Sequence, residues 1–247
     1  MNEIKPLALV FGGSRGIGAA CVDALARSGA DVAFTYASQS SAAREWEDKA
    51  GAHGAKVRGY RVDICDAKAV DDIFAQVQQD FGRAVRAVVA NAGINVPPAP
   101  VAQFPDDAFR SLVEVNIVGA FNVLRAAARE VSDGGAIVAL TTSLVRHAVP
   151  GVGPYSATKA AVECLVRSMS KELAARRVRV NAVAPGPVDT DLFRAGKTDE
   201  ARARSASMSP LNRIGEPHEV AQVVAFLLSD KASWVDGQIV QTNGGMV

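Results

Sequence analysis

The sequence has almost no net charge, and it contains few cysteines and few histidines. Its 27 basic and 26 acidic side chains leave a net charge of +1, so charge gives no reason to expect nucleic acid or an anionic membrane as a partner. Cys21, Cys65 and Cys164 are odd in number, far apart and without metal-ligand spacing, which indicates reduced thiols in a cytoplasmic protein. The histidines are equally scattered, and we predict no metal site.

The chain also lacks the features of a targeting or membrane segment. Residues 1–6 carry neither the charged nor the apolar region of a signal peptide, and no apolar run approaches the length of a membrane span. No repeat, low-complexity tract or linker-like stretch divides the 247 residues. Since 49% of the residues are hydrophobic, a sizeable core is available, and we expect one α/β domain over residues 1–247.

What the sequence does contain is a regular alternation of short apolar runs with helical periods. Seven runs have the composition of strands, at residues 7–11, 32–36, 57–62, 85–90, 136–140, 178–183 and 238–240. Helical patterns lie between them, the two longest at residues 106–129 and 155–175. This alternation predicts repeated βαβ units, and therefore a doubly wound parallel sheet flanked by helices on both faces.

A glycine-rich turn, Gly12-Gly13-Ser14-Arg15-Gly16-Ile17-Gly18, follows the first strand. Glycines let the backbone turn sharply and approach a diphosphate, whose charge then faces the N–H groups at the start of the next helix. No lysine follows, which disfavours an ATP-type phosphate loop. The same residues fit the Gly-x-Ser-x-Gly elbow of α/β-hydrolases, but that elbow normally lies further into the chain, with an acid and a histidine after it. We predict a dinucleotide site, with a hydrolase as the rival.

Tyr155 and Lys159 are the candidates for proton transfer. They are four residues apart, so on a helix both lie on one face, one turn from each other. A free phenol has a pKa near 10, which is too high for proton transfer at neutral pH by about 4 kcal/mol. One cation roughly 4 Å away supplies about that much at an effective dielectric constant of about 20. Because the same spacing occurs by chance on solvated helices, the pair indicates a catalytic site only in combination with the other motifs.

Together these motifs resemble the short-chain dehydrogenase/reductase family, from Leu7 to the carboxyl terminus. The residues that carry the resemblance are Gly12-x-x-x-Gly16-x-Gly18, Asn91-Ala92-Gly93, Asn116, Ser143, Tyr155 with Lys159, Pro185-Gly186-Pro187-Val188-Asp189-Thr190, Arg213-Ile214-Gly215-Glu216-Pro217 and Asn243-Gly244-Gly245. Each motif is loose by itself, but all of them in this order are specific. The resemblance implies a Rossmann-type fold that binds a nicotinamide dinucleotide.

The resemblance also implies catalytic roles. Tyr155 would exchange a proton with the substrate oxygen, and Lys159 would lower the phenol pKa and hydrogen-bond the nicotinamide ribose. Ser143 would hold the carbonyl oxygen, and Asn116 would hold a water that links Lys159 to solvent. Ser143 precedes Tyr155 by twelve residues, whereas a spacing one residue longer is frequent in the family and would select Thr142. We favour Ser143 and keep Thr142 as the alternative; Val145 and Val149 are also expected to contact substrate.

The cofactor-binding positions implied by the resemblance are Gly12, Ser14, Arg15, Gly16, Ile17, Gly18, Tyr36, Ser38, Asp63, Ile64, Asn91, Ala92, Gly93, Tyr155, Lys159, Pro185, Gly186, Val188 and Thr190. An NAD site usually has a carboxylate near the end of the second strand, but residues 34–38 offer none. Arg15 is suited to face a 2′-phosphate instead. We therefore expect NADP(H) to be preferred over NAD(H), with reduction as the working direction.

The substrate is less defined. Residues 191–213 are expected, from the resemblance, to form a mobile lid, and their slight excess of positive charge indicates either a solvated helix or contact with an acidic or phosphate-bearing substrate. The overall pattern is similar to 3-oxoacyl-[acyl-carrier-protein] reductases, which makes an acyl carrier protein a candidate partner. However, Ser132-Asp133-Gly134-Gly135 stands where we expect basic residues in such reductases.

Two functions of different classes follow from these patterns. The favoured one is an NADPH-dependent reductase of a small-molecule ketone. The other is a dinucleotide-binding module without turnover, such as a redox sensor, which would not need Ser143, Tyr155 and Lys159 together. Because the family is mostly tetrameric, a homotetramer is expected, with the helices over residues 106–129 and 155–175 packed against a neighbour.

Overall fold

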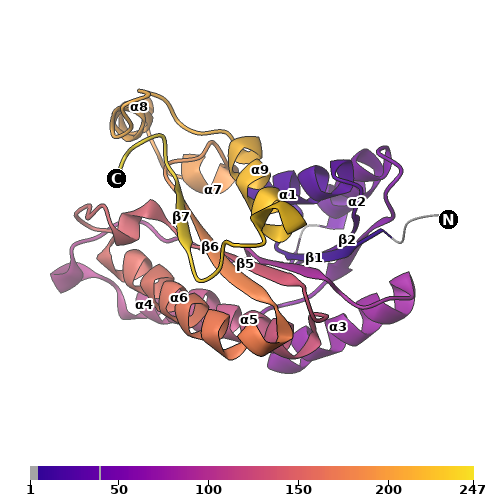
Figure 1. The fold of residues 1–247 in the computed structure, drawn as a ribbon. Helices are drawn as coiled ribbons and strands as arrows, with labels where there is room; N and C mark the ends of the chain where they lie inside the picture. The colour runs from indigo at the N-terminus through magenta and orange to yellow at the C-terminus, as the bar shows by residue number, and fades with distance from the viewer. Residues whose placement is uncertain (1–4, 39) are drawn as a thin grey trace.

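Seven strands pair in parallel, in the order β3-β2-β1-β4-β5-β6-β7, in the computed structural model, which describes residues 5–38 and 40–247 (Figure 1). Their bounds are β1 Leu7–Phe11, β2 Asp31–Tyr36, β3 Val57–Arg61, β4 Ala87–Ala90, β5 Ala136–Leu140, β6 Arg179–Pro185 and β7 Ile239–Thr242. The central strands β1 and β5 are buried along their whole length, as expected for parallel strands covered on both faces. The predicted doubly wound fold is confirmed.

The α-helices that cover the sheet are α1 Gly16–Arg27, α2 Ser40–Gly51, α3 Ala67–Phe81, α4 Asp106–Val113, α5 Ala120–Glu130, α6 Gly153–Glu172, α7 Asp191–Arg194, α8 Asp199–Ser207 and α9 Pro217–Leu228. Figure 1 shows α1, α2 and α9 on one face of the sheet and α3 to α6 on the other. Each face has its own hydrophobic core, one containing Val22, Leu25 and Val224 and the other containing Phe74 and Leu124.

The helix expected over residues 106–129 is not continuous. A π-helical segment, η2 Glu114–Gly119, separates α4 from α5. A π turn accommodates one extra residue, which breaks the simple helical period and changes the direction in which the side chains of this segment point. Here it buries Asn116 completely. By length and hydropathy residues 106–130 are apolar enough to span a membrane, yet Leu124 and its buried neighbours belong to the core against the sheet.

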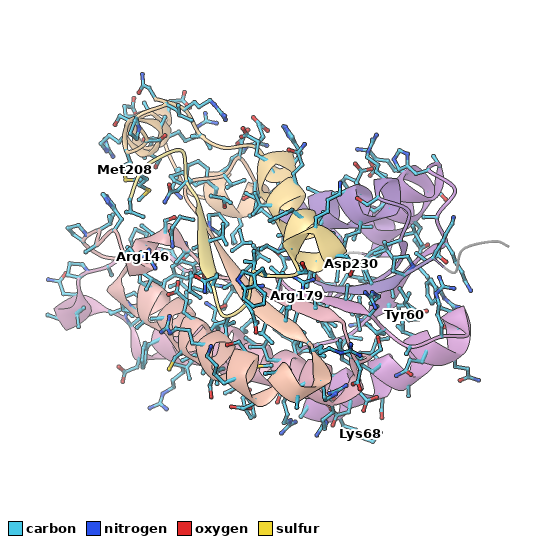
Figure 2. All side chains as sticks on the ribbon, viewed as in Figure 1. Tyr60, Lys68, Arg146, Arg179, Met208 and Asp230 are labelled. Atoms are coloured by element: carbon cyan, nitrogen blue, oxygen red, sulfur yellow. The ribbon has the colours of Figure 1, made fainter. Side chains whose placement is uncertain are left out.

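Arg179, at the start of β6, ties the last helix to the sheet (Figure 2). Its guanidinium donates hydrogen bonds to the carbonyl oxygens of Leu227, Ser229 and Ala232 at 2.6–3.0 Å. The first of these carbonyls ends α9, where orphan oxygens favour a cation. The contact helps to hold α9 against α1, the helix that follows the glycine-rich turn.

The order in which strands are added to the sheet reverses at β1. The first three strands extend from β1 toward one edge, and β4 then pairs on the other side of β1. In open parallel sheets this reversal leaves a crevice at the carboxyl ends of the two strands, because their following loops diverge. The segments after β1 and β4 are the glycine-rich turn and Asn91-Ala92-Gly93, so the topology brings two of the predicted motifs together.

Candidate active site

The glycine-rich turn after β1 is held close to the segment after β4. The Gly12 carbonyl oxygen accepts a hydrogen bond of 2.9 Å from the Asn91 amide, and the Gly12 N–H donates to the Thr35 hydroxyl at 3.2 Å. Gly12 has a φ of +76°, and a Cβ placed on it would lie 2.9 Å from the Cα of Ala92. A Cβ on Gly18 would collide with the Gly12 carbonyl oxygen. Side chains are therefore excluded at Gly12 and Gly18, and the turn passes close to the segment after β4.

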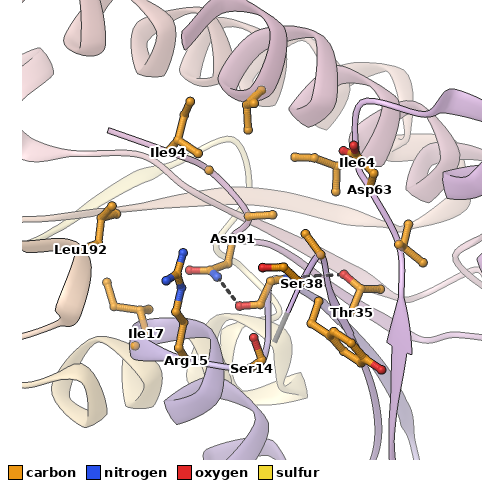
Figure 3. A pocket seen from close by; sticks show the side chains of 18 of the residues that line it. Ser14, Arg15, Ile17, Thr35, Ser38, Asp63, Ile64, Asn91, Ile94 and Leu192 are labelled. Carbon is orange, nitrogen blue, oxygen red and sulfur yellow. Dashed lines mark hydrogen bonds between the residues drawn. The ribbon is translucent and has the colours of Figure 1, made fainter. Parts of the chain in front are cut away.

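The start of α1 is suited to bind an anion. Its N-cap residue, Arg15, makes no side-chain cap, so the first N–H groups of the helix lack that partner. Such groups together with the helix dipole favour a phosphate. Figure 3 shows the Arg15 side chain extending into a cavity beside the glycine-rich turn, near Asn91 and Leu192. Arg15 is exposed and has no ion pair among the described residues, so its charge is available to a ligand.

This first cavity, which we call the dinucleotide cavity, has a volume of about 310 Å³. The predicted cofactor residues that line it are Gly12, Ser14, Arg15, Gly16, Ile17, Tyr36, Ser38, Asp63, Ile64, Asn91, Ala92, Gly93 and Thr190. Gly18 lies beneath the turn rather than in the wall. The lining residues at the carboxyl end of β2, residues 35–38, include no carboxylate. The lining carboxylates are Asp63, after β3, and Asp191, and Arg15 is the one cation among the described lining residues. The glycine-rich turn and the start of α1 thus line a cavity suited to the diphosphate of a dinucleotide.

A second cavity of about 250 Å³, which we call the substrate cavity, contains Tyr155. Ile17, Thr190 and Leu192 line both cavities, so the two spaces share a wall. Three further predicted cofactor residues, Pro185, Gly186 and Val188, line the substrate cavity instead of the dinucleotide cavity. Tyr155 itself lines the substrate cavity only, next to the dinucleotide cavity but not in its wall.

Lys159 lies one turn after Tyr155 on α6 and points toward the segment after β4. Its ammonium donates a hydrogen bond of 3.1 Å to the carbonyl oxygen of Leu140, the last residue of β5. A Cβ placed on Gly93 would lie 3.2 Å from the ammonium and 3.0 Å from Asn116 Oδ1. Lys159 thus stands directly behind the wall of the dinucleotide cavity, although it is buried and does not itself line it.

Asn116 fixes the chain around this ammonium. Its side-chain oxygen accepts from the Ile94 N–H, and its amide donates to the Ile94 carbonyl oxygen, both at 2.9 Å. The same amide donates to the Thr158 hydroxyl at 3.2 Å, and that hydroxyl donates to the Tyr155 carbonyl oxygen at 2.7 Å. Both amide hydrogens are thereby engaged by protein groups. The side chain links the π segment, the loop after β4 and the first turn of α6; the water-holding role expected for Asn116 stays a prediction.

Burial shifts the pKa values of both candidate groups away from their charged forms. The pKa of Tyr155 is raised to about 12, and the pKa of Lys159 is lowered to about 8, in each case by desolvation. We expected Lys159 to lower the phenol pKa, and the structure shows the opposite direction for Tyr155. The physical reason is that burial removes the phenolate from water, which raises the pKa of the phenol. At neutral pH the phenol is protonated and Lys159 is mostly charged.

The structure disagrees with the preference for Ser143 over Thr142. Ser143 is completely buried and does not line the substrate cavity. Its hydroxyl lies 2.9 Å from the Ala184 carbonyl oxygen and 2.9 Å from Gln241 Oε1, and it accepts from the Asn243 amide at 2.9 Å. Thr142, by contrast, lines the cavity beside Tyr155. Of the two candidates, Thr142 is therefore the one in the cavity wall; Thr141 also lines the cavity, but its hydroxyl donates to the Val183 carbonyl oxygen at 3.4 Å.

Of the two valines predicted to contact substrate, only one lines the cavity. Val149 lines the cavity as expected, but Val145 does not, because in the short 3₁₀ turn η3 Ser143–Val145 it is Leu144 that faces the cavity. Sequence patterns did not single out the remaining lining residues as substrate contacts; they include Asn95, Phe193, Lys197, Met208 and Met246. Several of them come from the segment expected to be a lid, which folds here as α7 and α8.

Known proteins resemble this chain over nearly all of its length. The family model described as enoyl-(acyl carrier protein) reductase matches residues 12–247. A short-chain type dehydrogenase/reductase of Picea abies is 38% identical over 250 residues, which cover 98% of this chain and 92% of the relative. A 3-oxoacyl-[acyl-carrier-protein] reductase, FabG, of Salmonella typhimurium is 33% identical over 242 residues, which cover 97% and 96%.

Among solved structures, a short chain dehydrogenase from Burkholderia cenocepacia in complex with NADP superposes with a TM-score of 0.91. It is 31% identical, and the alignment covers 99% of both chains. The similarity therefore extends over nearly the whole fold.

Proposed function

Because the chain belongs to the short-chain dehydrogenase/reductase family, we propose that this oxidoreductase reduces a ketone to a secondary alcohol with NADPH, reversibly, with Tyr155 as general acid and base. The similarity to 3-oxoacyl-[acyl-carrier-protein] reductases that the sequence predicted is confirmed. The observation that carries the proposal is the wall shared by the dinucleotide cavity and the substrate cavity, with Tyr155 in the latter.

NADP(H) is the cofactor we propose, in preference to NAD(H). Gly12, Asn91 and the uncapped start of α1 would hold its diphosphate, and Arg15 would face its 2′-phosphate. The Lys159 ammonium, behind Gly93, would hydrogen-bond its nicotinamide ribose. When bound, NADPH supplies the hydride that reaches the carbonyl carbon.

The protonation state of Tyr155 favours reduction as the working direction. As hydride reaches the carbon, the carbonyl oxygen becomes an alkoxide, which is about as basic as hydroxide, the conjugate base of water with a pKa of about 15.7. A phenol whose pKa is about 12 gives its proton to such an oxygen downhill. The reverse reaction would start from a phenolate, which burial disfavours. No lowering of the phenol pKa is therefore needed for reduction.

Thr142 would donate a second hydrogen bond to the same oxygen. Donors aimed at the atom where charge develops are effective because they are already oriented and lie where water is excluded. Lys159 would act through its charge and through the ribose, as a buried cation near the developing anion. Asn116 would keep the loop after β4 and the first turn of α6 in register, so that the phenol and the ammonium stay in place.

The test is the variant Tyr155→Phe. It removes only the hydroxyl, so NADPH should bind as in the wild-type protein, while oxidation of NADPH by a ketone should fall by about 10²–10⁴-fold, the usual contribution of a general acid. Undiminished turnover would refute the assignment. A wild-type protein that binds NADPH and reduces no carbonyl compound would instead favour the dinucleotide-binding module without turnover.

Two narrower proposals accompany this function. A homotetramer in the cytoplasm is proposed by analogy with the family, supported by the exposed Phe109 and Phe121 on α4 and α5, and a monomeric mass in solution would contradict it.

Reduction of thioesters on an acyl carrier protein is the alternative reaction. It is disfavoured by Asp133, which lies where we expected basic residues and pairs with Arg176 at 2.8 Å.

A further inference from the structure

The cations of the segment expected to be a lid are mostly neutralised by neighbouring carboxylates. Three of its five basic residues form ion pairs: Arg194 with Asp189, Arg202 with Asp199, and Arg213 with Glu219. Arg204 does not line the substrate cavity. The fifth cation, Lys197, is the one that does.

Lys197 has no carboxylate partner among the described residues. Its ammonium donates a hydrogen bond of 2.9 Å to the Phe193 carbonyl oxygen and lies 4.2 Å from the centre of the Phe193 ring. An ammonium has three donors, so two remain for a ligand. Partial burial lowers the pKa of Lys197, and no nearby acid opposes that effect. A cation in this position would gain from an anion in the cavity.

The other walls of the substrate cavity are apolar or uncharged. Of the described residues that line it, Lys197 is the only charged one. Thr142 and Tyr155 supply polar groups to it, whereas Leu144, Val149 and Met208 supply apolar surface. Figure 2 shows Met208 beneath α8, above the segment that carries Arg146. The volume of about 250 Å³ lies just below the usual range for ligand pockets, so a small ligand fits it.

We propose that the substrate is a small oxo acid, with an apolar chain between its ketone and its carboxylate, and that Lys197 binds the carboxylate while Thr142 and Tyr155 hold the ketone oxygen. This assignment rests on the proposed carbonyl reduction and names its substrate class. Lys197 is the one cation among the described lining residues, so it balances the single charge of a carboxylate, whereas a phosphate monoester, with a charge of about −1.5 to −2, would be left partly uncompensated. The notable consequence is a preference for acids over their neutral esters.

The experiment compares straight-chain oxo acids that differ in the number of methylene groups between ketone and carboxylate, each with its methyl ester. For the best chain length, kcat/KM should favour the acid over the ester by about fivefold, a modest factor because the lysine is partly exposed. In Lys197→Met, which keeps the length of the apolar stem, this ratio should fall to near one. Lys197→Arg should keep a preference for the acid. Arg204→Met is the matched control, because Arg204 belongs to the same segment but lies outside the cavity wall.

The outcomes distinguish a failure of the carboxylate subsite at Lys197 from a failure of the proposed carbonyl reduction. If the wild-type protein reduces acids and esters equally, or if Lys197→Met keeps the wild-type ratio, the carboxylate subsite is wrong and carbonyl reduction stands. If the wild-type protein reduces none of these ketones, carbonyl reduction fails for this class. Calorimetric titration of the NADPH-bound protein with acid and ester then tests the subsite alone, and it stands only if Lys197→Met selectively weakens binding of the acid.

Discussion

The hydroxyl that stabilises the developing alkoxide can be identified by comparing Thr142→Val with Ser143→Ala. Valine has nearly the shape of threonine, so Thr142→Val removes a hydroxyl from the wall of the substrate cavity while keeping that wall intact. Ser143→Ala removes a hydroxyl that lies outside the cavity, among the ends of β5, β6 and β7. The two variants therefore separate catalysis from stability.

The magnitudes follow from the contacts. Removing one donor to a developing oxyanion lowers kcat by about 10²–10³-fold, which is the effect expected for Thr142→Val. Its stability should change by less than about 1 kcal/mol, because the Thr142 hydroxyl only accepts a long bond of 3.3 Å from the Leu144 N–H. The single Ser143 hydrogen can serve one acceptor at a time, while its oxygen accepts from Asn243. Losing both bonds costs about 2 kcal/mol, or a Tm lower by about 4–8 °C.

The assay measures NADPH oxidation with one ketone, together with thermal unfolding of each variant. Thr142→Val should lose turnover at nearly unchanged Tm, and Ser143→Ala should lose Tm with a smaller effect on kcat. The opposite pattern, in which Ser143→Ala loses 100-fold or more in kcat at unchanged Tm and Thr142→Val stays active, would refute the placement of the two hydroxyls.

Three further predictions address the cofactor and the buried lysine. Arg15→Ala should raise the Kd of NADPH on the order of tenfold and that of NADH much less, as measured by fluorescence titration; equal effects would remove the argument for a 2′-phosphate contact. Because burial lowers the pKa of Lys159 to about 8, the charged form is lost as pH rises through that value, and kcat/KM for reduction should fall about tenfold per pH unit above it. A flat profile up to about pH 10 would show that the charge is not needed. Gly93→Ala should displace Asn116 Oδ1 and the Lys159 ammonium, which its new methyl group would approach at 3.0 Å and 3.2 Å, and should lower both kcat and Tm; full activity at unchanged Tm would mean that both groups can move without consequence.

The sequence determined the strands, the cofactor loop and the Tyr155–Lys159 pair, because each depends on interactions that are local in the chain. Continuous apolar runs such as residues 7–11 suit strands that are buried on both faces. Gly12 adopts a positive φ that other residues rarely adopt, so its place in the turn is visible in the residue type itself. The four-residue spacing of Tyr155 and Lys159 sets their relation on α6 whatever the rest of the fold does.

Only the tertiary structure decided which hydroxyl and which lysine line the substrate cavity. Ser143 is drawn away from the cavity by Ala184, Gln241 and Asn243, partners that lie 41 to 100 residues further along the chain. The π segment buries Asn116 at a depth that a regular helix pattern does not indicate. Lys197 is one of five cations in its segment, and it is distinguished by where carboxylates such as Asp189 and Glu219 come to lie after folding. Contacts of this kind depend on which strands and loops become neighbours in the fold, and the residues next to each position in the sequence do not indicate that.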